Sequence, residues 1–152
     1  MKKTRKLQKL RPTSSLVKNA LFNILGDIEG ITFVDLFAGT GQIGMEAQKR
    51  GARVIFVEKN PSLASTIRKK AQGKVVCTDA LKFLGKLKDS PDVIFADPPY
   101  NFSRYVELIY KAIEVLSPGG IFILEHDKWH SFDADEERVY GDTVLSFWRK
   151  AP

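Results

Sequence analysis

The feature that most constrains the fold is a regular alternation of short apolar runs with amphipathic segments along most of the chain. Runs of strand length and β-branched character are expected at residues 31–37, 53–58, 74–77, 92–96 and 121–125. Helices are expected between them at residues 42–50, 60–72, 80–87 and 105–116. Because strands that alternate with helices form parallel sheets, this order predicts an α/β domain with helices on both faces of a mostly parallel sheet.

The two ends of the chain extend this pattern. Thr13 or Ser14 is suited to cap a helix whose apolar stripe runs from Leu16 to Leu25. Near the other end, residues 138–141 and 143–149 read as two strands with only a turn between them. A turn this short cannot carry a crossover, so the pair predicts an antiparallel hairpin at the edge of the parallel sheet.

Composition limits the classes of function. With 152 residues the chain has the length of one domain. Its one cysteine, Cys77, can form neither an intrachain disulfide nor a cysteine metal site, and we expect no metal. No apolar run reaches the length of a membrane span. The single cysteine fits a reducing compartment, so we expect a cytoplasmic protein without a membrane segment. We also expect a monomer.

Positive charge is concentrated at the N-terminus. The net charge is +6, and beyond residue 11 the 18 remaining Lys and Arg residues balance 18 Asp and Glu residues. We therefore divide the chain into a basic arm, residues 1–11, and a folded domain, residues 12–152. A basic arm on a neutral body suits a polyanion, although a solubilising tail would have the same composition. The basic residues of the arm are Lys2, Lys3, Arg5, Lys6, Lys9 and Arg11.

A glycine-rich segment follows the first expected strand. Gly39, Gly41 and Gly44 match the G-x-G-x-x-G spacing, which nicotinamide, flavin and adenosylmethionine sites share. Glu58, at the end of the second strand, is placed to accept both hydroxyls of a ribose. Asp35 separates the alternatives, because a carboxylate inside this apolar strand suits a cationic ligand with an α-amino group. Its other interpretation is a side chain that accepts backbone N–H groups of the loop.

Asp79 and Ala80 close the third strand. The Asp79 carboxylate is a candidate acceptor for the exocyclic amine of an adenine. Because Asp79 directly precedes an expected helix, its position by itself favours the N-cap of that helix, and both roles are compatible.

The tetrapeptide Asp97-Pro98-Pro99-Tyr100 follows the fourth strand and carries the most specific chemistry. Two prolines fix φ and remove two N–H donors, so a stiff bend presents oxygen acceptors. If the Asp97 carboxylate and the Pro98 carbonyl each accept one N–H of an exocyclic amine, the nitrogen lone pair turns toward an incoming methyl group. Tyr100 would stack on the base, a contact worth about 1–3 kcal/mol. The alternative is an ordinary proline-rich turn with an exposed aspartate.

Taken in order, these motifs resemble those of class I S-adenosylmethionine-dependent methyltransferases. With Arg11-Pro12-Thr13, the helix ending Leu21-Phe22-Asn23-Ile24-Leu25, and Tyr140-Gly141-Asp142-Thr143, the chain resembles the bacterial family that methylates guanine N2 in small-subunit (16S) ribosomal RNA. The resemblance implies a Rossmann-like sheet of seven strands with an antiparallel C-terminal strand. It implies S-adenosylmethionine as cofactor, and ribosomal RNA or the small-subunit particle as partner.

The resemblance also implies roles for individual residues. The target base would be held by Asp97, Pro98, Pro99 and Tyr100. The cofactor would be held by Asp35, Phe37, Gly39, Thr40, Gly41, Glu58, Lys59, Asp79 and Ala80. Nucleic acid would be contacted by Thr13, Arg104 and the six basic residues of the arm.

Several side chains near the strand ends have two interpretations. His126 and His130 are expected at the surface near a strand end, because transfer to an amine needs no strong base. Phe102 and Tyr105 follow the tetrapeptide and suit either the lining of a base pocket or packing in the core.

Three other functions are compatible with parts of the pattern. A DNA adenine-N6 or cytosine-N4 methyltransferase shares the tetrapeptide. A nicotinamide oxidoreductase shares the glycine spacing, but Asp35 and the tetrapeptide argue against it. A non-catalytic RNA-binding module would keep the basic arm without turnover.

Overall fold

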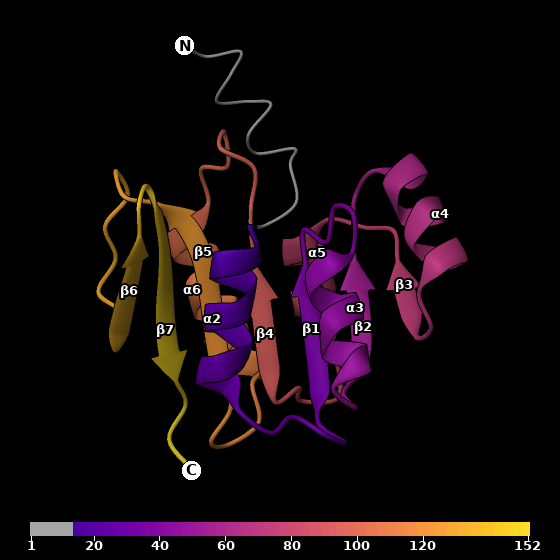
Figure 1. Cartoon of the computed structure of the whole chain (residues 1–152), viewed down its shortest axis with the longest axis horizontal. Helices are drawn as coiled ribbons and strands as arrows, with labels where there is room; N and C mark the ends of the chain where they lie inside the picture. The colour runs from indigo at the N-terminus through magenta and orange to yellow at the C-terminus, as the bar shows by residue number, and fades with distance from the viewer. Residues whose placement is uncertain (1–13) are drawn as a thin grey trace.

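The computed structural model describes residues 14–152, and within them the chain forms one mixed sheet flanked by helices (Figure 1). The sheet has seven strands in the order β3-β2-β1-β4-β5-β7-β6. The predicted fold class, a mostly parallel sheet with an antiparallel C-terminal strand and helices on both faces, is confirmed. The strands are β1 (Thr32–Leu36), β2 (Arg53–Val57), β3 (Lys74–Val76), β4 (Val93–Ala96), β5 (Ile121–Asp127), β6 (Glu136–Tyr140) and β7 (Thr143–Arg149).

The first five strands are parallel to their neighbours. β1 lies at the centre and pairs with both β2 and β4, with Leu36 opposite Val57 on one side and Ala96 on the other. The C-terminal hairpin is antiparallel, as predicted, but its second strand is the inner one. β7 pairs with β5 over seven residue pairs, from Ile121–Arg149 to Asp127–Thr143, and β6 forms the outer edge.

Five helices of the described chain cover the two faces: α2 (Ser15–Leu25), α3 (Gln42–Lys49), α4 (Pro61–Lys70), α5 (Ala80–Lys86) and α6 (Tyr105–Val115). One core cluster packs α2, α3 and Ile67 of α4 against one face of the sheet. A second cluster packs α5 and α6 against the other face. In Figure 1, α2 and α3 lie in front of the sheet and α6 behind it. Alternation of strand side chains between the two faces separates the clusters.

Helix starts follow the capping chemistry expected from the sequence. Ser14 caps α2 by accepting the N–H of Val17 at 3.2 Å. Asn60 caps α4 ahead of Pro61, and Asp79 caps α5 by accepting the N–H of Lys82 at 3.1 Å. These caps place the first turn of each helix directly after the segment that precedes it.

The expectation that His126 lies at the surface is wrong. β5 continues past Glu125 to Asp127, and His126 is 1% exposed. Its Nε2 lies 2.7 Å from Ser146 Oγ on β7, and its Nδ1 lies 2.7 Å from the Asp127 carbonyl oxygen. Pairing with β7 extends β5 and encloses the imidazole, and this burial lowers the His126 pKa. His130, by contrast, is partly exposed, with 37% of its side chain accessible.

No helix in residues 14–152 combines the length and apolar character that crossing a bilayer requires.

Candidate active site

The candidate site lies where the parallel strands end. Phe37 follows the last residue of β1, Glu58 that of β2 and Asp97 that of β4. These three last residues are paired in register. Because parallel strands keep their register, the three residues leave the sheet at one level, next to one another. This is the edge at which open α/β sheets bind ligands.

The loop after β1 turns sharply at this edge. Phe37 has a φ of 56°, which is uncommon for a residue with a side chain, and Gly39 and Gly41 have φ values of 59° and 79°. The turn closes when Gly41 donates its N–H to the Ala38 carbonyl at 2.8 Å. Gly44 has a different role: a Cβ there would lie 2.3 Å from the Phe56 ring. The loop therefore depends on glycine for backbone conformation at its start and for close helix–strand packing at its end.

Asp35 is buried beneath this loop, with 2% of its surface exposed. Its Oδ2 accepts the N–H of Gly44 at 3.0 Å, the backbone hydrogen bond that the alternative interpretation predicted. Burial raises the Asp35 pKa well above its ordinary value; the Gly44 hydrogen bond opposes this rise, and the charges of Asp97 and Glu58 add to it. The cofactor role of Asp35 stays a prediction, but its acidic neighbours are the other two predicted site carboxylates.

Glu58 holds the glycine loop to the next helix. One carboxylate oxygen accepts the N–H of Gly39 at 2.7 Å, and the other accepts the N–H of Asn60 at 2.8 Å. Both oxygens are therefore oriented by backbone donors, which fixes the carboxylate at the end of β2. Its predicted ribose contact would use the remaining lone pairs.

The other predicted cofactor residues lie in the segments that follow β1, β2 and β3. Asp79 is the N-cap of α5, and Ala80 is buried behind it. Thr40 and Lys59 are exposed on the loops after β1 and β2. The cap role of Asp79 is therefore observed, whereas the adenine contact stays a prediction.

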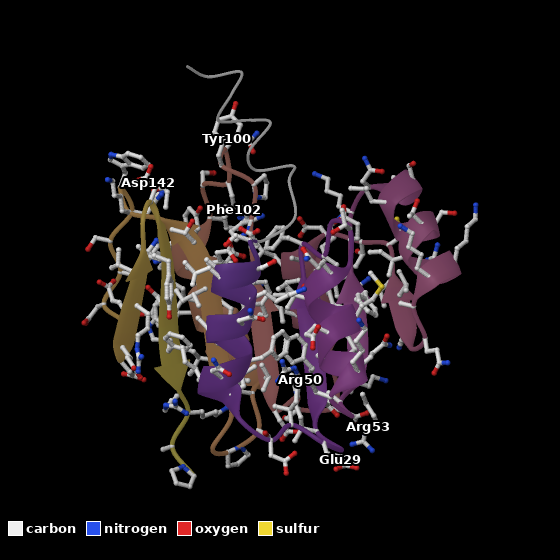
Figure 2. All side chains as sticks on the ribbon, viewed as in Figure 1. Glu29, Arg50, Arg53, Tyr100, Phe102 and Asp142 are labelled. Atoms are coloured by element: carbon white, nitrogen blue, oxygen red, sulfur yellow. The ribbon has the colours of Figure 1, made fainter. Side chains whose placement is uncertain are left out.

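The segment Asp97 to Tyr100 forms a bend after β4. Pro98 is buried, Pro99 is exposed, and the bend is closed by the N–H of Phe102 donating to the Pro99 carbonyl at 2.9 Å. Figure 2 shows Tyr100 at the upper end of the molecule with Phe102 below it, nearer the sheet. Asp97 is half-buried, so its carboxylate is held at the sheet while the ring of Tyr100 reaches outward.

Aromatic rings join the bend to the glycine loop. The Phe102 ring lies 5.3 Å from that of Phe37 and 5.0 Å from that of Tyr105, both edge-to-face. Tyr105 in turn lies 5.1 Å from Phe132. Burial raises the pKa of Tyr105 to about 12, with Asp127 and Asp97 adding to the rise, so its hydroxyl stays protonated at neutral pH. The Asp97 bend and the Phe37 turn therefore form one packed unit.

The residues predicted to contact nucleic acid lie at the start of α6 or outside the described residues. Arg104 is exposed at the N-cap of α6, where its Nε donates to Glu107 at 2.9 Å. Binding a phosphate there would require Arg104 to leave or share that partner. Thr13 and the basic residues Lys2, Lys3, Arg5, Lys6, Lys9 and Arg11 lie outside the described residues.

The residues at this edge fit a cationic ligand with hydrogen-bond donors. The carboxylates of Glu58 and Asp97 both lie within electrostatic range of Asp35, so a positive group near Asp35 relieves this repulsion. Gln42, at the start of α3, has a buried Oε1 with no hydrogen-bond partner among the described residues. An amino group of a ligand would satisfy such an atom. No group of His, Cys, Asp and Glu in residues 14–152 is arranged to hold a metal.

Sequence reasoning missed Gln42 and the role of Asn60 as a partner of Glu58. It left Phe102 and Tyr105 open between a base pocket and core packing, and the structure packs both rings between the glycine loop and the bend. Aromatic spacing after the tetrapeptide is the one signal that pointed to them. The Gln42 atom had no signal, because burial of a single oxygen depends on the tertiary packing around it.

Comparison with known proteins gives a consistent set of relatives. A family model described as Conserved hypothetical protein 95 matches residues 2–149. The Ribosomal RNA small subunit methyltransferase D of Haemophilus influenzae is 33% identical over 133 residues, which cover 78% of this chain and 69% of that protein. The Putative rRNA methyltransferase YlbH of Bacillus subtilis is 29% identical, with coverage of 90% and 79%.

A solved structure extends the comparison at the level of fold. The Thermus thermophilus 16S rRNA N2 methyltransferase RsmC, in complex with AdoMet and guanosine, superposes with a TM-score of 0.79. The superposition covers 92% of this chain and 43% of that protein at 22% identity. At this identity the similarity establishes a shared fold alone.

Proposed function

Because the chain belongs to the Conserved hypothetical protein 95 family, which includes the ribosomal RNA small subunit methyltransferase D proteins, we propose that it methylates ribosomal RNA. The methyl donor is S-adenosylmethionine, and the acceptor is the exocyclic N2 of a guanine in small-subunit (16S) RNA. Relatives named as rRNA methyltransferases and a shared fold with an AdoMet-bound enzyme support the donor and the class of RNA. The Asp97 bend supports an amino nitrogen as the acceptor.

The observation that carries the proposal is the common level of Phe37, Glu58 and Asp97 at the ends of three paired strands. The glycine loop and Glu58 hold the cofactor, and the bend from Asp97 to Tyr100 holds the base directly beside it. A base on the bend and a cofactor on the loop then approach without any movement of the sheet. Such fixed positioning supplies much of the rate in a transfer that needs no covalent intermediate.

The residues of the bend prepare the acceptor. S-adenosylmethionine, when bound, supplies an electrophilic methyl group on a sulfonium. Asp97 and the Pro98 carbonyl accept the two N–H groups of the amine, which directs the nitrogen lone pair at that methyl carbon. Asp97 would accept the proton that the nitrogen loses on methylation and pass it to water. Tyr100 stacks on the base and holds its plane.

The predicted cofactor residues determine the charge and the shape of the cofactor pocket. Asp35 and Asp97 place negative potential near the α-amino and sulfonium groups, and Glu58 accepts the ribose hydroxyls. Asp79 and Ala80 border the adenine. Phe37, Thr40 and Lys59 complete the border of the pocket, with Gly39 and Gly41 allowing the backbone to approach closely.

The test compares Asp97→Asn with Asp142→Asn, a carboxyl change in the exposed β6–β7 turn. Labelled S-adenosylmethionine is incubated with small-subunit particles, free 16S RNA or duplex DNA, and the methylated nucleoside is identified by mass spectrometry. We expect N2-methylguanosine in RNA, a loss of rate of about 10²–10³ in Asp97→Asn, and a wild-type rate in Asp142→Asn. Cofactor affinity, measured by calorimetry, should change by less than about tenfold, since the amide keeps an oxygen acceptor at position 97.

Three results would contradict the proposal. Methylation of DNA alone would favour an adenine-N6 or cytosine-N4 enzyme. Cofactor binding without turnover on any nucleic acid would leave a non-catalytic module. A full rate in Asp97→Asn would remove Asp97 from the mechanism.

A further inference from the structure

Charge is distributed unevenly across the sheet, apart from the basic arm. Residues 53–88 contain nine Lys and Arg and two Asp and Glu, whereas residues 125–142 contain two Lys and Arg and seven Asp and Glu. The first segment forms β2, α4, β3 and α5, and the second spans the end of β5 and all of β6. Because β3 and β6 are the two edges of the sheet, one edge of the folded domain is basic and the other acidic.

An open groove lies at the basic edge. It is bordered by the first residues of β1, by β2, by β3 along its length to Thr78, by α5, and by the loop from Leu87 to Asp92. It contains none of the predicted cofactor residues. The starts of these strands lie at the end of the sheet opposite the candidate active site. Figure 2 shows Arg53 at the lower end of the molecule and Tyr100 at the upper end. At the strand starts the groove is therefore distinct from the predicted cofactor residues, and it reaches Thr78, beside Asp79, only at its far end.

The groove exists because α5 is short. This helix has seven residues and packs against α6, so it leaves the outer strands on its face partly uncovered. Ile55 of β2 and Val76 of β3 pack with the α5 core cluster but are only half-buried. They form an apolar floor, together with Phe83.

Five cations surround that floor: Arg53, Lys74, Lys82, Lys86 and Lys88. Lys74 is opposite Ile55 in the β2–β3 register, so Lys74 and Arg53 point to the same face two residues apart along the strands. Lys82 and Lys86 are one helical turn apart on α5. All five residues are exposed.

Few acids in the groove compete for these cations. The Asp92 carboxylate already accepts the N–H of Thr32 at 3.0 Å and the hydroxyl of Ser117 at 2.9 Å. Asp89 is the other acid of the lining. Some cations elsewhere in the described chain have a close acid, as Arg50 has Glu46 at 3.0 Å, whereas no ion pair within it is found for the five groove cations. The groove therefore keeps a concentrated positive potential.

We propose that this groove binds the phosphodiester backbone of the RNA substrate, at a distance from the methylated base. The inference rests on the proposed function, because that function supplies a polyanionic partner larger than the active site. Charge complementarity selects the occupant: closely spaced cations gain most from a chain of phosphates, whose counterions they release. The contacts carry no base specificity, so they act on the affinity for RNA and on its orientation rather than on the methyl-transfer step.

The experiment compares Lys82→Gln/Lys86→Gln with Lys49→Gln/Arg149→Gln, a matched pair of exposed cations outside the groove. Binding of each full-length protein to 16S RNA and to small-subunit particles is measured over a range of salt concentrations. We expect the groove variant to bind free RNA and particles about tenfold more weakly, with the slope of log affinity against log salt reduced by about two. Its KM for RNA should rise while kcat and cofactor affinity stay unchanged, and the control should match wild type.

Equal affinity and salt slope in the groove variant and the control would overturn the inference. Weaker binding to particles with unchanged binding to free RNA would also overturn it, because the groove would then contact a protein of the particle. Failure of the proposed function is distinguishable, since wild-type protein would then methylate no RNA. Thermal melting of both variants checks that neither substitution affects the fold.

Discussion

At the scale of single residues, the buried carboxylate of Asp35 affects both the stability of the fold and the candidate site. It is fully buried, it accepts the N–H of Gly44, and two other carboxylates raise its pKa further. A buried charge without a cation nearby destabilises the folded state. We expect the cofactor to supply the missing positive charge. Asp35 would then lower the stability of the free protein and raise its affinity for the cofactor.

The burial of Asp35 predicts that Asp35→Asn changes the thermal stability of the protein in a pH-dependent way. Because folding raises the Asp35 pKa, the folded state is favoured when Asp35 is protonated, and that stability is lost as pH rises through the folded pKa. The neutral amide keeps an acceptor for Gly44 and avoids this loss. In the absence of cofactor, Asp35→Asn should raise Tm by about 3 °C or more at about pH 8, with the gain shrinking toward about pH 4.

The Tm of wild type and variant, measured across this pH range with and without S-adenosylmethionine, tests this prediction. The cofactor should stabilise wild type more than the variant. A variant less stable than wild type at the alkaline end of the range would contradict the burial argument, and equal stabilisation of both by cofactor would contradict the ligand role.

At the scale of elements, the packing of α3 against β2 sets the position of the glycine loop. Gly44 is within α3, and the Phe56 ring of β2 occupies the space where a Cβ would lie, 2.3 Å away. The absence of a side chain lets α3 approach the sheet, and the N–H of Gly44 thereby reaches Asp35. Packing and the site geometry are therefore coupled at one residue.

Gly44→Ala should lower the free energy of unfolding by about 2–3 kcal/mol, because the added methyl group collides with a fully buried ring. Phe56→Leu provides the matched test, since a smaller side chain makes room for the methyl group. In urea unfolding, the double variant should be more stable than the sum of the two single effects by about 1 kcal/mol or more. Strict additivity would show that the collision does not determine the cost.

At the scale of the whole molecule, two basic surfaces are proposed to bind RNA, the basic arm and the groove at the β3 edge. The arm supplies the net charge of the chain, while the described domain is polarised between its two edges. An arrangement of this kind orients a polyanion before binding and raises its association rate at low salt. Both surfaces are then expected to act on RNA affinity.

Deleting residues 2–10 removes Lys2, Lys3, Arg5, Lys6 and Lys9. RNA affinity and its salt slope should both fall, the slope by about one for each phosphate that the arm no longer neutralises, while cofactor affinity stays at the wild-type value. Filter binding across salt concentrations, with calorimetry for the cofactor, provides the measurement. Unchanged RNA binding would make the arm a solubilising tail and leave the groove as the basic surface.

The sequence by itself determined the element order and the sheet class, because hydrophobic periodicity, helix caps and turn residues act locally. Asn60 and Asp79 could be assigned as caps from their positions alone, and the Asp97–Tyr100 bend from its two prolines, whereas the choice of Ser14 over Thr13 needed the structure. The order of the glycine loop, Glu58 and the bend along the chain sufficed to predict one shared site, since parallel strands bring their ends to one edge.

Only the tertiary structure decided which strand of the hairpin pairs with β5, and this pairing buried His126 against Ser146. It alone brought Arg53, Lys74 and the lysines of α5 around one groove. The physical reason is common to both cases: burial and charge clustering depend on interactions between segments far apart in the chain. Local patterns specify each segment's conformation, whereas its neighbours are chosen by packing of the whole domain.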